Sequence, residues 1–231
     1  MSLRAIHFKN SSHLQYRLVP QMKAYHAGWV IYYCELSGVA AFAVTGTLMA
    51  GRKSLDWFGV ITISLVTALG GGALRDVLMA HYPIEWVSNE NGFLVGVSAS
   101  LGTMIWARTL KTFNDRVLLV ADAFGLAVFT VRGTDMALQQ NLPPSIAVIM
   151  GVATAVAGGV MRDVLCNEVP LVFKREVYAS ISILGAVAYI TLLDLQISLE
   201  VASAIAIAFV FVSRIAAIRW KWKLPRFDVV D

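Results

Sequence analysis

Long runs of apolar residues separated by short polar connections cover most of the chain. The runs lie at residues 29–50, 57–80, 93–110, 116–137, 143–167, 176–193 and 198–218. A helix needs about 20 apolar residues to cross a hydrocarbon core about 30 Å thick. The pattern therefore predicts an all-α integral membrane protein with seven transmembrane helices and no room for a soluble domain.

The first six runs form an internal repeat. An offset of 87 residues aligns positions 35–83 with 122–170 without a gap, and 18 of the 49 aligned pairs are identical. The identical pairs include Gly71 and Gly72 with Gly158 and Gly159, Arg75 and Asp76 with Arg162 and Asp163, and Thr67 with Thr154. Because each repeat holds three helices, we expect the second to enter the bilayer in the opposite direction.

This pattern divides the chain into four parts. We expect an N-terminal extension at 1–28, three-helix repeats at 29–112 and 113–195, and a seventh helix with a basic tail at 196–231. An inverted repeat places the second helix of each half at equivalent positions, where transporters of this type hold their solute. The site is therefore expected near the second and fifth helices.

A glycine-rich segment lies inside each of these two helices. The glycines are Gly70, Gly71 and Gly72 in the first repeat and Gly158 and Gly159 in the second, where Ala157 takes the first place. Glycine permits unwinding, and an unwound backbone at membrane depth must face protein or a water-filled cavity. We expect both segments to unwind and the carbonyl oxygens of Gly70, Gly71 and Gly158 to bind a monovalent cation. Alternatively, the glycines only allow close helix packing.

Charged residues within the apolar runs are costly, at roughly 2.5–3.5 kcal/mol each, and often functional. We single out seven of them as candidates: Glu35, Arg75, Asp76, Asp122, Arg132, Arg162 and Asp163. Since helix neighbours at i and i+1 do not face each other, we expect Arg75 and Arg162 to pair across the structure, with Asp163 and Asp76 or with Asp122 and Glu35. These pairs either line the pathway or only lock the helices together. Arg132 has Thr45 at its matching position, and this asymmetry makes Arg132 a candidate for gating or voltage sensing.

Hydroxyl side chains supply candidates for a polar pore lining. They are Thr47, Ser64, Thr67 and Thr154. The sequence contains no HExxH motif, no nucleophile with a paired histidine and no phosphate-binding loop. The two cysteines lack metal-ligand spacing. We therefore expect no enzymatic activity and no cofactor beyond a bound Na+ or K+.

Composition and charge agree with a membrane protein. Hydrophobic residues make up 58% of the chain, charged residues 15%, and the mean hydropathy is +0.67. The net charge of +4 does not indicate nucleic acid binding, because the basic residues lie at helix ends, in alternate connections and in the C-terminal tail. These are Arg52, Lys53, Arg108, Lys111, Arg116, Lys174, Arg175, Arg219, Lys221, Lys223 and Arg226.

The positive-inside rule then places the N-terminus outside and the C-terminus in the cytoplasm. Four basic residues in the first 27 positions disagree with this orientation. The run from Arg219 to Lys223 alternates basic residues with Trp220 and Trp222, a pattern typical of an anchor at membrane lipid headgroups.

The doubled motif carries a family resemblance. Gly70-Gly71-Gly72-x-x-Arg75-Asp76 and Gly158-Gly159-x-x-Arg162-Asp163, set in two three-helix halves plus a seventh helix, resemble the prokaryotic trimeric intracellular cation (TRIC) channels. The same sequence group is also described as a bacterial inner-membrane glycine-transporter domain family. The resemblance covers about residues 29–218.

The resemblance implies a homotrimer in which each protomer has its own pore, lined by the second and fifth helices kinked at their glycines. Such a pore conducts monovalent cations, K+ and Na+. Transport of glycine or another small amino acid is the alternative function.

Overall fold

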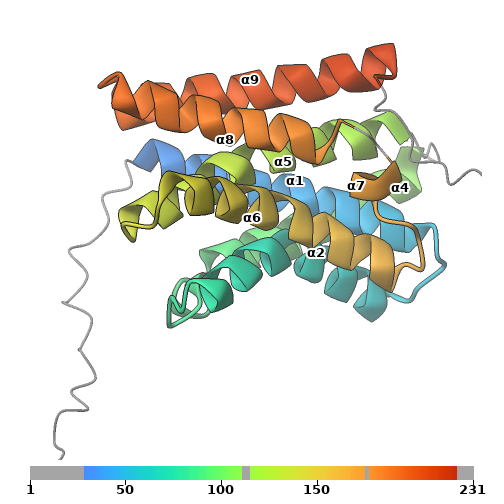
Figure 1. Cartoon of the computed structure of the whole chain (residues 1–231). Coiled ribbons are helices and arrows are strands. Elements are labelled where there is room, and N and C mark those ends of the chain that lie inside the picture. Colours follow the sequence, from blue (N-terminus) through green and yellow to red (C-terminus); the bar gives the residue numbers. More distant parts are fainter. Residues whose placement is uncertain (1–28, 111–114, 175–176, 223–231) are drawn as a thin grey trace, which may run out of the picture.

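The computed structural model describes residues 29–110, 115–174 and 177–222. The predicted extension at 1–28 and the end of the basic tail lie outside the described residues. The helices are α1 (Trp29–Gly51), α2 (Trp57–Leu78), α3 (Glu85–Ser88), α4 (Asn91–Leu110), α5 (Asp115–Gln139), α6 (Pro144–Leu165), α7 (Leu171–Lys174), α8 (Ala179–Asp194) and α9 (Leu199–Trp220). They form one bundle in which α9 lies along one edge (Figure 1).

The bundle has the dimensions of a membrane protein. Among the described residues, α1, α2, α5, α6 and α9 are long and apolar enough to cross a bilayer, and α8 is a shorter apolar helix. The described part of the chain contains no strand. An all-helical membrane fold is thereby confirmed, while the exact number of spanning helices stays a prediction.

Local sequence signals explain where the two glycine-rich helices begin. The side chain of Asp56 accepts a 2.7 Å hydrogen bond from the backbone N–H of Gly59 and caps α2. At the matching place before α6 stands Pro143, followed by Pro144 at the first helical position. A proline at the first helical position has no backbone N–H that would lack a hydrogen-bond partner, and its fixed φ angle is compatible with a helix.

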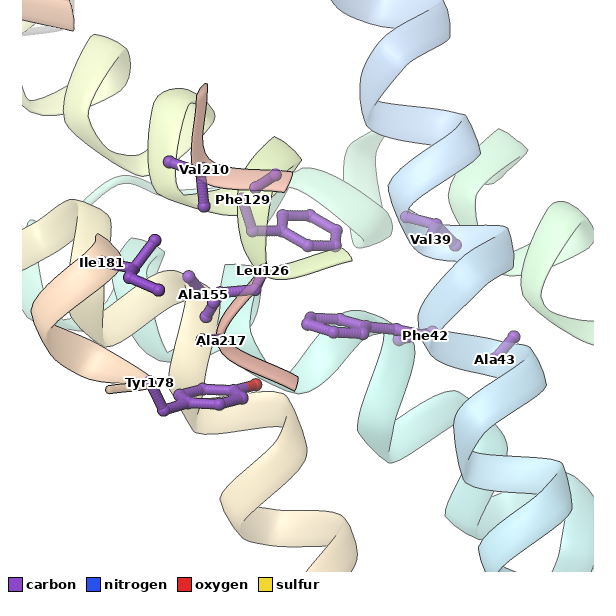
Figure 2. Packing of buried hydrophobic residues seen from close by; sticks show 12 residues of the cluster. Val39, Phe42, Ala43, Leu126, Phe129, Ala155, Tyr178, Ile181, Val210 and Ala217 are labelled. Carbon is purple, nitrogen blue, oxygen red and sulfur yellow. The ribbon is translucent and has the colours of Figure 1, made fainter. Parts of the chain in front are cut away.

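The centre of the bundle is built by α1 and α5. Phe42 of α1 stacks on Phe129 of α5, with ring centroids 5.2 Å apart (Figure 2). A Cβ atom on Gly38 would lie 2.9 Å from the Cγ1 atom of Val128, and a Cβ atom on Gly125 would collide with the ring of Phe42. Both glycines therefore allow the two helices to approach closely. Early residues of one helix thus meet late residues of the other, so the two helices run antiparallel.

The last two helices pack against this centre. Gly185 of α8 leaves space for Val210 of α9, and Tyr189 of α8 is fully buried. Arg214 of α9 is also buried, with its guanidinium 4.6 Å from the centroid of the Tyr178 ring. The sequence interpretation overlooked this arginine, although it lies within the last apolar run.

Candidate functional site

Both glycine-rich segments are helical. The helix α2 is continuous through Gly70, Gly71 and Gly72, and α6 is continuous through Gly158 and Gly159. The predicted unwinding is therefore wrong. In a continuous helix each carbonyl accepts the N–H four residues further on. The predicted cation site on the carbonyls of Gly70, Gly71 and Gly158 loses the feature on which it was based.

Two of these glycines let α2 and α6 touch. A Cβ on Gly71 would collide with the carbonyl oxygen of Thr154, and a Cβ on Gly158 would collide with that of Thr67. The contacts are reciprocal, so the helices cross antiparallel. Gly71 and Gly158 thus allow close packing, as small residues do between membrane helices.

The other three glycines border side chains. A Cβ on Gly70 would lie 2.7 Å from the sulfur of Met161. A Cβ atom on Gly72 would lie 3.7 Å from Nη2 of Arg75. A Cβ atom on Gly159 would lie at the same distance from Nη2 of Arg162. In each of the two helices, the glycine-rich segment therefore contacts both the facing helix at the crossing and the repeated arginine.

The predicted pore threonines are buried next to the crossing. Thr67 donates its hydroxyl to the carbonyl of Ile63, and Thr154 donates to that of Met150, both at 2.6 Å. Each side chain is fully buried. An ideal Cβ on Gly46 would lie 2.7 Å from the Thr67 hydroxyl, and Thr154 packs on Gly133 in the same way, at 2.5 Å.

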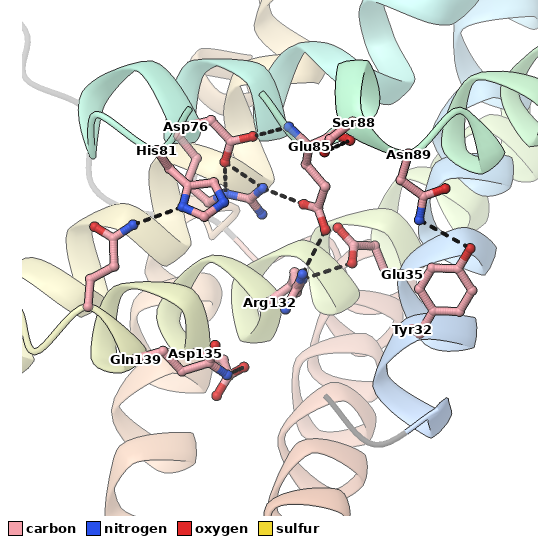
Figure 3. Close-up of polar contacts among 12 residues, drawn as sticks. Tyr32, Glu35, Asp76, His81, Glu85, Ser88, Asn89, Arg132, Asp135 and Gln139 are labelled. Atoms are coloured by element: carbon pink, nitrogen blue, oxygen red, sulfur yellow. Dashed lines mark hydrogen bonds and ion pairs between the residues drawn. The ribbon is translucent and has the colours of Figure 1, made fainter. Parts of the chain in front are cut away.

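Arg75 is held by carboxylates on its own helix and at the start of α3. Its Nε donates to Asp76 at 2.9 Å and its Nη2 to Glu85 at 2.7 Å. Figure 3 shows both of these acids, and Glu85 also points toward Arg132. The backbone N–H of Glu85 donates to the other oxygen of Asp76 at 2.9 Å. The long, flexible side chain of Arg75 therefore reaches the residue next to it in sequence. The expectation that adjacent residues do not pair is wrong here.

Arg132 joins this network from α5. It forms ion pairs of 2.8 Å with Glu35 of α1 and with Glu85. We call this network the Arg75 cluster; it consists of Arg75, Asp76, Glu85, Arg132 and Glu35. Glu85 was not among the sequence candidates, because it lies between two apolar runs. The structure places Glu85 at the centre of the cluster.

Two arginines keep Glu85 ionised. Burial alone would raise the pKa of this carboxyl group, but the charges of Arg132 and Arg75 outweigh burial and lower the pKa to about 2. A lowered pKa stabilises the folded state at pH values above the unfolded value. This contribution is lost only as the pH falls toward about 2. Glu85 therefore acts as a fixed negative charge at neutral pH.

The second repeated arginine has a similar environment. Arg162 donates to Asp163 at 2.8 Å, to Asp122 at 3.1 Å and to the hydroxyl of Thr45 at 2.9 Å. All four side chains are buried. They are called the Arg162 cluster below. Arg162 pairs with Asp122 and Asp163, both of its own repeat, and not with an acid of the other repeat as expected. Its pairing with Asp163 again contradicts the i to i+1 argument.

Corresponding backbone contacts complete both clusters. The N–H of Leu171, in α7, donates to Asp163 at 2.8 Å, as the N–H of Glu85 donates to Asp76. Leu171 carries no charge, so Glu85 is a feature of one cluster alone. Glu35 also differs from its counterpart Asp122, because it pairs with Arg132 and not with the repeated arginine.

The two clusters lie on opposite sides of the helix crossing. Arg75 and Arg162 each stand four residues beyond a crossing glycine, on antiparallel helices. At 1.5 Å per residue, the two positions are about 12 Å apart along the helix axes. Any path along the α2–α6 contact therefore passes one cluster, the crossing and the other cluster.

Around the described residues, the two sides of this crossing differ in open space. The cavity beside the Arg75 cluster, called the Arg75 cavity, offers about 50 Å³ to the centres of water molecules. It is bordered by Glu35, Gly72, Arg75, Asp76 and Glu85, among others. The space beside Arg162 and Tyr178 offers essentially none. The two halves thus differ in access although their charge pairs correspond.

A further buried acid was also overlooked in the sequence. Asp135 of α5 accepts hydrogen bonds from the Tyr189 hydroxyl at 2.9 Å and from Gln139 at 2.7 Å. It lies within the fourth apolar run, so an inventory of charges in the runs could have included it. Within the described residues, no group of three or more His, Cys, Asp or Glu side chains is placed to hold a metal ion.

Comparison with known proteins identifies relatives along most of the chain. The sequence profile of the family described as glycine transporter matches residues 32–108 and 119–194. The UPF0126 inner membrane protein YadS of Escherichia coli is 39% identical over 199 residues, which cover 86% of this chain and 96% of YadS.

Solved structures give the same picture. The TRIC channel orthologue from Rhodobacter sphaeroides is 36% identical, with a TM-score of 0.78, over 84% of this chain and 99% of that one. A prokaryotic TRIC channel crystallised in 0.5 M KCl is 28% identical, also with a TM-score of 0.78, over 85% and 99% of the two chains. These similarities support a cation channel in a membrane.

Proposed function

Since this chain belongs to the membrane protein family that includes the UPF0126 proteins and the prokaryotic TRIC channels, we propose that it conducts monovalent cations, K+ and Na+. Each protomer of a homotrimer has its own pore, between α2 and α6. The trimer follows from the trimeric channels that the chain resembles.

The proposed topology is seven spanning helices in a 3+3 inverted repeat, with α9 outside the symmetry. Contacts between equivalent residues support it, because a residue lies against its own counterpart only near a two-fold axis. Phe42 stacks on Phe129, and the ideal Cβ position of Gly71 lies 3.5 Å from the nitrogen of Gly158. Both helix pairs run antiparallel, as opposite insertion requires.

The proposed orientation has the N-terminus outside and the C-terminus in the cytoplasm. The asymmetry of lysine and arginine between alternate connections supports it. The E. coli relative is an inner membrane protein, and we propose the same membrane for this chain. The Arg75 cluster then faces outward and the Arg162 cluster inward.

The observation that carries cation conduction is that carboxylates outnumber arginines in both clusters. Three carboxylates face two arginines in the Arg75 cluster, and two carboxylates face one arginine in the Arg162 cluster. Each cluster has a formal charge of −1. In a water-poor site such a charge attracts cations and repels anions. Conduction requires α2 and α6 to separate at Gly71 and Gly158.

Planar-bilayer recordings of the purified protein in asymmetric KCl test this function. We expect currents whose reversal potential lies close to the K+ equilibrium potential, because the net charge of both clusters excludes chloride. Replacing K+ with a large organic cation should abolish the current. Currents that reverse at the chloride potential, or no currents from correctly assembled trimers, would refute the proposal.

A carrier for a small amino acid is the second candidate. One observation favours it: space is open at the Arg75 cluster and closed at the Arg162 cluster, as in a carrier that exposes its site to one side at a time. Saturable, stereoselective amino acid uptake into proteoliposomes without single-channel currents would establish the carrier. Currents without saturable uptake would establish the channel.

Arg132 is the proposed regulator of conduction. Its replacement by glutamine changes the charge of the Arg75 cluster from −1 to −2. We expect larger K+ currents at 0.01 M salt and little difference at 1 M, because the screening length falls from about 30 Å to about 3 Å. Lys53→Gln, which removes an exposed pair with Glu168, is the matched control. An equal effect of both variants, or one independent of salt, would contradict a role for Arg132.

A further inference from the structure

The Arg75 cavity combines acidic and aromatic side chains. Its lining residues include the acids Glu35 and Glu85 and the aromatic residues Tyr32, Trp86 and Phe129. Aromatic faces attract an ammonium group within about 6 Å of the ring centre, and carboxylates accept its hydrogen bonds. A water molecule or an alkali ion would interact with the acidic residues but would gain little from the aromatic ones. The rings indicate an organic cation.

One donor in the cavity wall has no partner. Arg75 is 1% exposed. Its Nε and Nη2 donate to Asp76 and Glu85, while its Nη1 is buried without a hydrogen bond. An unpaired guanidinium N–H in a buried place is unfavourable. It calls for a ligand oxygen that accepts a hydrogen bond.

The size and charge of the cavity narrow the ligand further. A space of about 50 Å³ for water centres holds about three or four waters, and the small residues Ala68, Gly72 and Gly92 form part of its wall. The formal charge of −1 favours a monocation over a neutral zwitterion. The ligand is therefore small, carries one ammonium group and has an oxygen acceptor.

We propose that the Arg75 cavity binds a small amino-alcohol cation of the size of ethanolamine. Its ammonium group lies between the aromatic rings and the carboxylate of Glu35, and its oxygen accepts from Arg75 Nη1. The Arg162 cluster also has an unpartnered guanidinium nitrogen, Nη2. The closed space there leaves no room for a ligand. The proposed site therefore exists in one half only.

Calorimetric titration of the full-length protein in maltoside micelles, which contain no amine, tests the site. We expect saturable binding of ethanolamine. Ethylammonium lacks the hydroxyl group and should bind about fivefold more weakly, because Arg75 Nη1 remains unpaired. Glycine, which has no net charge, should also bind more weakly than ethanolamine. Absence of saturable ethanolamine binding, or tighter binding of glycine, would overturn the proposal.

Two tryptophans supply a matched pair of variants. Trp86 borders the cavity and is 40% exposed, while Trp106 on α4 is 39% exposed and is not part of the cavity wall. Trp86→Leu should weaken ethanolamine binding about fivefold through loss of a cation–π contact, and Trp106→Leu should leave it unchanged. Glu35→Gln should weaken it about tenfold. Equal effects of the two tryptophan variants would overturn the proposal.

The same chemistry occurs in a lipid headgroup, and a second comparison separates the two sources. In phosphatidylglycerol nanodiscs ethanolamine should bind as in micelles. If phosphatidylethanolamine nanodiscs suppress this binding, the site accepts the lipid headgroup; if they do not, it accepts the free cation. Either result supports the site. Because binding is measured without ion flow, its failure would leave cation conduction untouched.

Discussion

Replacing Arg162 with glutamine should strongly destabilise the protein. The change leaves the carboxylates of Asp122 and Asp163 buried without a counter-charge. Breaking a buried ion pair by removing one partner costs about 3–5 kcal/mol. Total stabilities are about 5–15 kcal/mol, so a large part of the stability is lost. Size-exclusion chromatography of the heated protein should show a much lower melting temperature than the wild type.

Two further variants test whether the loss of stability comes from carboxylates left buried without a partner or simply from the loss of an ion pair. Lys53→Gln breaks an exposed pair with Glu168 and should cost less than about 1 kcal/mol. Adding Asp122→Asn to Arg162→Gln removes one of the stranded carboxylates and should recover part of the lost stability. An Arg162→Gln protein as stable as Lys53→Gln would show that the Arg162 cluster does not hold the helices together.

The helices themselves could be predicted from the sequence because the signal for them is local. An apolar run of about 20 residues has few alternatives to a buried or spanning helix. The 87-residue repeat also predicted that Arg75 and Arg162 would have related surroundings, and the N–H groups of Glu85 and Leu171 bind the two aspartates in the same way. These features depend on residues close together in the chain.

The details of the site depend on residues far apart in the chain, and here the sequence was insufficient. Three glycines in a row are compatible with unwinding and with close packing. The choice depends on the facing helix, where the carbonyl of Thr154 occupies the place of a side chain on Gly71. Glu85 lies outside the apolar runs. It reaches Arg132 because the short helix α3, which begins at Glu85, packs against α2 and α4.

The second large effect is expected at the helix crossing, where Gly71→Ala and Gly158→Ala should separate α2 from α6. Each new methyl group would collide with a backbone carbonyl, of Thr154 or of Thr67. A backbone oxygen cannot move aside like the end of a flexible side chain. Overpacking of this kind costs about 1–3 kcal/mol per site. The variants should melt at lower temperature, although alanine is by itself the better helix former.

Gly102→Ala is the matched control for this prediction, because its methyl group would meet no atom within 4 Å. On α4 it should be neutral or stabilising by up to about 1 kcal/mol. In the proposed pore, separation of α2 and α6 is also the movement that opens a path for ions. Any Gly71→Ala or Gly158→Ala protein that still assembles should therefore conduct K+ more often than the wild type at low voltage. Unchanged melting and unchanged currents in both variants would show that the crossing is neither a tight contact nor a barrier to ions.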